Sequence, residues 1–168
     1  MKTPKRESGP LGKSVVESDP QLSKRANTVK AWLDAKPGAA ADNLFAGSGS
    51  TPVALIYKVA GKIFAILSVR RIENVILKCD PQLATMLRER YNGIGHRSHL
   101  DRRYWISVTL DADVPSKEIW RLVTQSYDLV CIKLTRKQKA ELARLASRRT
   151  RARDRNSFRK VDAGPRTR

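Results

Sequence analysis

The stretch 52-PVALIYKVAGKIFAILSV-69 decides the fold of this chain. It contains two runs rich in β-branched and aliphatic residues, 52–60 and 62–69, on either side of Gly61. Two such runs separated by a glycine predict a tight β-hairpin. The segment 72-IENVILKC-79 has the same character and predicts a third strand. The centre of the chain is therefore expected to be a mainly antiparallel sheet.

Helical patterns precede and follow this centre. Residues 22–35 carry an apolar face at helical spacing, with Ser23 placed as its N-cap and Pro37-Gly38 as its end. The small residues of 38–51 predict a loop. Asp80 and Pro81 predict the start of a second helix, because Asp is a preferred N-cap and Pro is preferred at the first helical position.

The second half of the domain also contains both helical and strand patterns. Residues 92–103 predict a polar, basic loop, 104–110 a strand, and the stretch after Pro115 a third helix with an apolar stripe. Thr135 and Gln138 form a capping-box pattern that opens a fourth helix, expected to fade into the basic sequence RRTRARDRNSFRK. The order of elements predicts an α+β fold, an antiparallel sheet with helices packed on it.

The charge of the chain is concentrated at one end. The formal net charge is +18 over 168 residues, of which +11 falls in residues 133–168 and only +4 in residues 26–132. We expect three regions: a disordered segment over 1–21, a domain over 22–134, and a basic extension over 135–168 that is partly helical and then disordered. Charge of this size indicates an anionic partner and says little about the fold.

Several classes of protein are disfavoured by the sequence. Cys79 and Cys131 stand apart in apolar surroundings, and neither they nor His96 and His99 follow the spacing of a metal finger, so two buried free thiols are expected. No cofactor and no metal are expected. No apolar run approaches the roughly 18 residues that span a bilayer, and no signal-peptide pattern is present, so we expect a cytoplasmic protein without a membrane partner.

An ordered set of short motifs resembles a known family, the MmcQ/YjbR proteins, over about residues 25–135. The motifs are Lys36-Pro37-Gly38, Tyr57-Lys58-Val59-Ala60-Gly61-Lys62-Ile63-Phe64-Ala65, Leu77-Lys78-Cys79-Asp80-Pro81, Leu87-Arg88-Glu89-Arg90-Tyr91 with Gly93-Ile94, His99-Leu100, Trp105, Val114-Pro115 and Ser126-Tyr127-Asp128-Leu129-Val130. No single motif is distinctive, and the resemblance rests on their order and spacing. The basic extension lies outside it.

The resemblance implies a frataxin-like (CyaY-like) fold of the double-wing type and a proposed DNA-binding role in which hairpin wings meet the nucleic acid. Ala60 replaces the first glycine of the usual Gly-Gly turn, and Asp101-Arg102-Arg103 stands where an Asn-Lys type of sequence is common. The acidic ridge that binds iron in frataxins needs clustered carboxylates on the first helix, where this chain has only Asp34.

Three basic regions are candidate nucleic-acid contacts, each with a simpler alternative. The extension can neutralise phosphates or merely keep the chain soluble, and lysines at a hairpin tip are common in any protein. In the loop, basic groups beside Tyr104 and Trp105 suit phosphate contact and base stacking, although Trp105 fits a core position better. The candidate residues are Lys58, Lys62, Arg70, Arg71, Arg97, His99, Arg102, Arg103, Arg148, Arg149, Arg151 and Arg153.

The leading interpretation is a non-enzymatic DNA-binding protein, with DNA favoured over RNA and with the oligomeric state open. The runner-up is a module that binds RNA or an acidic protein. A small enzyme acting on an anionic substrate near His99 is the third possibility, but no catalytic residue can be assigned because no nucleophile–base arrangement is evident. Gly93-Ile94-Gly95 is not a phosphate cradle, since it follows no predicted strand and the glycine pattern is incomplete.

Overall fold

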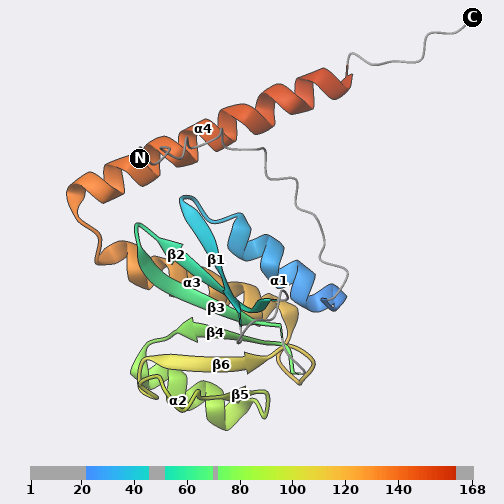
Figure 1. Cartoon of the computed structure of the whole chain (residues 1–168), viewed down its shortest axis with the longest axis vertical. Helices are drawn as coiled ribbons and strands as arrows, with labels where there is room; N and C mark the ends of the chain where they lie inside the picture. The colour runs from blue at the N-terminus through green and yellow to red at the C-terminus, as the bar shows by residue number, and fades with distance from the viewer. Residues whose placement is uncertain (1–21, 46–51, 70–71, 162–168) are drawn as a thin grey trace, which may run out of the picture.

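The computed structural model describes residues 22–45, 52–69 and 72–161, and of residues 149–161 it describes the backbone. Its centre is a six-stranded antiparallel sheet in the order β1-β2-β3-β4-β6-β5 (Figure 1). The strands are β1 Ala39–Phe45, β2 Pro52–Val59, β3 Lys62–Ser68, β4 Asn74–Lys78, β5 Ile94–Gly95 and β6 Trp105–Thr109. The helices are α1 Lys24–Asp34, α2 Pro81–Arg90, α3 Ser116–Ile132 and α4 Arg136–Val161. The expected α+β fold is confirmed.

The central hairpin is as tight as predicted. Val59 pairs with Lys62, so the loop between β2 and β3 contains only Ala60 and Gly61. Both have positive φ, 48° for Ala60 and 78° for Gly61. Two-residue turns with positive φ at both positions match the twist of the flanking strands, and they favour glycine at each position. Ala60 therefore holds a left-handed conformation that its Cβ disfavours.

The loop prediction for 38–51 is wrong over its first half, because residues 39–45 form β1 along the free edge of β2. Alanine, aspartate and asparagine have low strand propensity, so the composition of AAADNLF gave no strand signal. The unpaired N–H and C=O groups of the neighbouring strand supply what the composition lacks. The short strand β5 arises in the same way within the predicted loop 92–103, because Ile94 and Gly95 pair with Val108 and Ser107 of β6.

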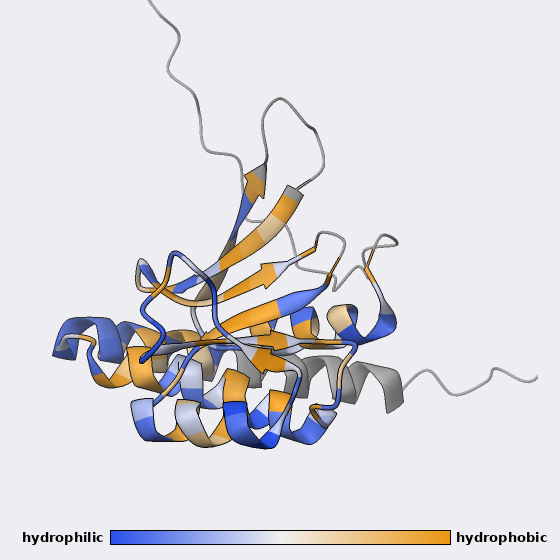
Figure 2. Ribbon diagram, turned by 90° about the horizontal axis from the view of Figure 1, so that it is seen from below, coloured by the Kyte–Doolittle hydropathy of each residue, from blue (hydrophilic) through white to orange (hydrophobic). Residues whose placement is uncertain are grey.

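The helices gather on one side of the sheet, and the central strands of the sheet consist largely of hydrophobic residues (Figure 2). The predicted stripe of α3 is buried as expected, at Ile119, Leu122, Val123, Ser126 and Val130. The hydroxyl of Ser126 accepts a hydrogen bond from the Lys78 N–H at 2.8 Å and donates one to the Phe64 carbonyl. This hydroxyl ties α3 to both β3 and β4.

The helix starts obey the predicted capping chemistry. The Ser23 hydroxyl accepts from the Ala26 N–H, and the Asp80 carboxylate accepts from the N–H groups of Gln82 and Leu83. At the start of α4, the Thr135 hydroxyl accepts from the Gln138 N–H at 3.3 Å, while Gln138 Oε1 accepts from the Thr135 N–H at 3.0 Å. The capping box is therefore present, in its reciprocal form.

The fourth helix is longer than expected. It continues through the sequence predicted to lose helical structure and ends at Val161, a length of 26 residues or about 39 Å. Alanine, arginine and lysine are strong helix formers, and this propensity outweighs the scarcity of apolar residues beyond Ala146. The predicted disorder of 1–21 falls outside the described residues. None of the described helices is long and apolar enough to cross a membrane.

Candidate nucleic-acid interface

Helix α4 is attached to the domain by its first turns. Leu142 packs against the hydrophobic core, and a Cβ on Gly38 would come within 2.3 Å of Leu142 Cδ2. Gly38 has a φ of 66°, so it combines a left-handed turn before β1 with a close approach to the helix. The sequence predicts the first role, whereas the second requires knowledge of where α4 lies.

The described part of α4 has two faces. Gln138, Leu142, Leu145 and Ala146 are half-buried, whereas five basic side chains are exposed: Arg136, Lys137, Lys139, Arg144 and Arg148. Over its whole length the helix carries eleven basic and two acidic residues, a balance of +9. Of the predicted contacts, Arg148 is exposed, and Arg149, Arg151 and Arg153 lie on α4 with side chains outside the described residues. The extension is thus a cationic helix over most of its length, and its first turns dock on the domain.

The two predicted hairpin lysines have different surroundings. Lys58 lies on β2, next to the edge strand β1. Its ammonium pairs with the carboxylate of Asp42 on β1 at 2.6 Å. Lys62 is exposed at the start of β3. Because the composition of residues 39–45 does not predict β1, it does not predict this ion pair either. Arg70 and Arg71 lie outside the described residues.

A guanidinium from α2 holds the basic loop in place. Arg88 donates hydrogen bonds to the carbonyls of Arg102 at 2.7 Å and Trp105 at 2.9 Å, and a longer one to Gly95 at 3.4 Å. One fork-shaped side chain therefore fixes both ends of the loop, a task that suits arginine better than lysine. Arg88 belongs to a quoted motif, yet its spacing along the chain does not reveal these carbonyl partners.

One basic side chain of the loop, Arg103, is already engaged by its neighbours. Arg103 pairs with Asp101 at 3.0 Å, and its guanidinium lies 5.5 Å from the centre of the Tyr104 ring. Arg97, His99 and Arg102 are exposed. Within the part of the chain that the structure describes, His99 has no hydrogen-bond or ion-pair partner.

A cleft of about 740 Å³ opens at the end of the sheet where β3 begins, β4 ends and β6 begins. In Figure 1 these strand ends lie at the left-hand edge, beside the end of α3. Its charged lining consists of Lys62, Lys78, Lys133, Asp80 and Asp101, and the remainder is Ile63, Cys79, Pro81, Tyr104, Trp105, Leu129 and Val130. We call this the lysine cleft. It brings Lys62 together with Tyr104 and Trp105, which the sequence assigned to two separate regions.

Lys78 and Lys133 are cleft residues that the sequence analysis did not single out. Lys78 is cross-strand partner to Trp105, and its ammonium lies 4.2 Å from the centre of a Trp105 ring, a cation–π contact. Burial lowers the pKa of Lys78, and the nearby Lys133 ammonium lowers it further. The sequence signal that could have indicated Lys78 is its position at the end of the apolar run of β4.

Two predictions about burial need correction. Trp105, expected in the core, is half-buried because the outer face of β6 is only partly covered by the Lys78 side chain. Both cysteines are free thiols, but only Cys79 is buried, while Cys131 is partly exposed in the last turn of α3. Burial raises the pKa of Cys79 to about 11, so this thiol is protonated and unreactive at neutral pH. Among the described residues no three metal-ligating side chains form a cluster that could hold a metal ion.

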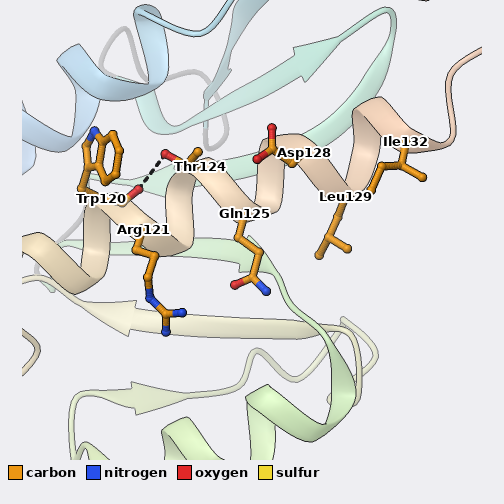
Figure 3. Close-up of a pocket in the computed structure, with 7 residues that line it drawn as sticks. All are labelled: Trp120, Arg121, Thr124, Gln125, Asp128, Leu129 and Ile132. Atoms are coloured by element: carbon orange, nitrogen blue, oxygen red, sulfur yellow. Dashed lines mark hydrogen bonds between the residues drawn. The ribbon is translucent and has the colours of Figure 1, made fainter.

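A second hollow lies along the outer side of α3 and encloses about 360 Å³ (Figure 3). Trp120 and Asp128 point to one side of the helix, and Arg121 and Gln125 point to the other. Trp120 is 49% exposed and Ile132 is 69% exposed. This surface is mainly apolar and carries one acidic and one basic residue, Asp128 and Arg121, so it lacks the charge expected of a nucleic-acid contact.

Comparison with solved structures supports the fold. Protein DR2400 of Deinococcus radiodurans, which contains the DUF419 domain, matches with a TM-score of 0.61 and 25% identity, covering 76% of this chain and 92% of that one. A protein from Pseudomonas syringae matches with a TM-score of 0.52 and 22% identity, covering 64% of this chain and 98% of that one, and this likeness concerns the fold alone.

Comparison with curated sequences points the same way. The protein YjbR of Escherichia coli (strain K12) is 37% identical over 73 residues, and YyaQ of Bacillus subtilis (strain 168) is 40% identical over 53 residues. These matches cover 42% and 32% of this chain, and 60% and 44% of the two relatives. A family model described as YjbR matches residues 34–129, which is more than half of the chain and includes β2, β3, β4 and α2 with most of α3. The chain belongs to the YjbR family.

Proposed function

We propose that this protein binds nucleic acid without catalysing a reaction, and that duplex DNA is the preferred form. The observation that carries the proposal is helix α4, which docks through one half-buried face and holds half of the chain's net charge, +9 of +18. A cationic helix anchored to a domain presents phosphate-binding groups at fixed spacing, whereas a disordered tail must be ordered before it binds in one conformation.

The dimensions of α4 favour DNA over RNA. An α-helix with its side chains is about 10–12 Å wide, and the major groove of B-DNA is about 12 Å wide. The major groove of A-form RNA is deep and narrow and does not admit side chains. A helix of this width therefore fits the DNA groove or its phosphate rims, and it meets duplex RNA only from outside.

The domain supplies a second, smaller set of contacts. Lys62, Arg97 and Arg102 are exposed without an ion-pair partner among the described residues, so their charges are available to phosphates. Lys58 and Arg103 already pair with Asp42 and Asp101, and a phosphate would have to displace those carboxylates. In this arrangement the β2–β3 hairpin acts as the wing that meets the nucleic acid, with Lys62 as its leading cation.

A salt titration tests the role of α4. The affinity of the full chain for a labelled duplex is measured by fluorescence anisotropy at several salt concentrations. Replacing Arg148 and Arg151 with glutamine should reduce the slope of log affinity against log salt by about 1.8, because each phosphate contact contributes about 0.9. The matched control replaces Lys24 and Lys117, both exposed and far along the chain from α4, and should leave the slope nearly unchanged.

The outcomes separate the proposal from its rivals. Equal slopes for the two double variants would show that charge acts without regard to position, and would remove α4 as the anchor. Binding weaker than about 10⁻⁴ M at low salt would reject nucleic-acid binding altogether and favour an acidic protein partner. If duplex RNA binds as tightly as duplex DNA of the same length, the preference for DNA is wrong.

A further inference from the structure

The lysine cleft is a built pocket that is distinct from α4. Its three lysines come from three elements: Lys62 begins β3, Lys78 ends β4, and Lys133 is the C-cap of α3. A volume of about 740 Å³ lies within the range of about 300–1,000 Å³ typical of small-molecule sites. A duplex is far too wide to enter a pocket of this size.

The three ammonium groups have no carboxylate partner. Among the described residues none of Lys62, Lys78 and Lys133 forms an ion pair, and the ammonium of Lys133 is close enough to lower the pKa of Lys78 after burial has done so. Holding like charges together without a counter-charge is unfavourable, and an anion bound between them removes the repulsion.

The two carboxylates that line the cleft are already engaged. Asp80 caps α2 by accepting from the N–H groups of Gln82 and Leu83, and Asp101 pairs with Arg103 through both of its oxygens. The charge of Asp101 is therefore balanced by Arg103, and the Asp80 carboxylate is held at the start of α2 by backbone N–H groups. The cleft as a whole offers three unpaired cations to whatever enters it.

The rest of the wall is apolar or aromatic. Ile63, Pro81, Leu129 and Val130 supply aliphatic surface, and Tyr104 and Trp105 supply rings, of which Tyr104 is 49% exposed. A small inorganic anion would satisfy the lysines and leave this surface in contact with water. A ligand with a flat, weakly polar body and an anionic head satisfies both parts of the wall.

We propose that the lysine cleft binds a single nucleotide unit, with its phosphate among Lys62, Lys78 and Lys133 and its base against the aliphatic and aromatic wall. The unit can be a free mononucleotide or the phosphorylated end of a single strand, since both present the same base and phosphate. This site is separate from the proposed duplex-binding role of α4.

The test measures binding of AMP, adenosine and inorganic phosphate to the full chain by isothermal titration calorimetry. AMP should bind at least tenfold more tightly than either adenosine or phosphate, because only AMP contacts both parts of the wall. Replacing Lys78 and Lys133 with glutamine should raise the Kd for AMP at least tenfold. The matched control replaces Lys24 and Lys117, which are exposed and do not line the cleft, and should leave the Kd unchanged.

Lys78 is half-buried, so the thermal unfolding of its variant is compared with that of the unaltered chain. Lys62→Gln provides an independent test, because Lys62 is exposed and its loss should weaken AMP binding without affecting folding. The proposal is overturned if phosphate binds as well as AMP, or if the control lowers AMP affinity as much as the cleft variants do. Either result would mean that AMP is held only by non-specific electrostatic attraction to a cationic protein.

Two further arms identify the source of the nucleotide and keep the two proposals apart. The first arm measures whether a short single strand competes with AMP, with and without a 5′-phosphate. Competition by the phosphorylated strand alone assigns the cleft to strand ends. Competition by neither strand assigns it to free nucleotides. The Arg148/Arg151 variant should alter the salt slope for duplex and leave AMP binding intact, whereas the Lys78/Lys133 variant should do the reverse.

Discussion

Leu142 of α4 lies over Gly38, so close that a single methyl group on the glycine would stand 2.3 Å from the leucine Cδ2. This contact joins the basic helix to the turn before β1. It is one of the points at which the extension and the YjbR domain meet, and it makes the position of α4 sensitive to one atom.

Replacing Gly38 with alanine should lower the free energy of unfolding by about 2–4 kcal/mol. About 1–2 kcal/mol arises from a left-handed backbone, since φ is 66°, and the rest from overpacking against Leu142. The measurement is unfolding in denaturant. With Leu142→Ala already in place, the cost of Gly38→Ala should fall to the backbone part alone, about 1–2 kcal/mol. Strictly additive effects would contradict the proposed contact.

Replacing Ala60 with glycine should stabilise the protein by a few tenths of a kcal/mol up to about 1 kcal/mol. The substitution relieves a φ of 48°, and the greater freedom of glycine in the unfolded chain offsets part of the gain. Thermal unfolding checks the sign. Gly61→Ala serves as the opposite control, because nothing lies within 4 Å of the added Cβ and only the left-handed backbone opposes it. A destabilising Ala60→Gly would mean that Ala60 is not strained.

Replacing Arg88 with lysine should loosen the loop between β5 and β6 while leaving the charge unchanged. Arg88 reaches the carbonyls of Arg102 and Trp105 from Nη2 and that of Gly95 from Nε. A lysine has one nitrogen and cannot serve both ends of the loop, so at least one charge-assisted hydrogen bond is lost, at a cost of about 1–3 kcal/mol. Hydrogen exchange should accelerate at the amides of Leu100 and Tyr104, which hydrogen-bond within the loop. Amides of the β2–β3 hairpin are the internal reference, and equal acceleration there would indicate general destabilisation instead.

Asp113 should make the stability of the protein depend on acid pH. Its carboxylate accepts hydrogen bonds from the N–H groups of Gly93 and Asn92, both at 2.8 Å, and these bonds lower the pKa of Asp113. A lowered pKa means that the stabilisation is complete above the unfolded value of about 3.9 and is lost as the pH falls through the folded value. The difference in stability between the unaltered chain and Asp113→Asn should therefore shrink below about pH 4, as measured by denaturant unfolding. A constant difference from pH 7 to pH 2.5 would contradict this role.

The sequence predicted those parts of the fold whose signals are local. The caps at Ser23, Asp80 and Thr135 and the turn at Gly61 depend on a few neighbouring residues, and all are present. Strand β1 could not be predicted, because its residues are poor strand formers that pair only when the edge of β2 is available. Strong local helix propensity also explains why α4 extends beyond its expected end.

The candidate sites were harder to predict, because they depend on side chains brought together by the fold. Ser126 was recognised as part of an apolar stripe, although its hydroxyl links α3 to two strands. The sequence predicts Lys58 as a nucleic-acid contact, but the fold places Asp42 of β1 beside it. Lys78 and Lys133, 55 positions apart in the printed sequence, meet only because β4 and α3 end at the same edge of the sheet.

Under the duplex-binding role proposed for α4, the length of this helix sets the footprint of the protein on a duplex. A helix of 26 residues measures about 39 Å, and one turn of B-DNA rises about 34–36 Å over about 10 base pairs. Each bound molecule should therefore occlude close to one helical turn. Saturating a long duplex should require one chain per ten or so base pairs, and duplexes much shorter than one turn should bind progressively less well as contacts at the end of the helix are lost.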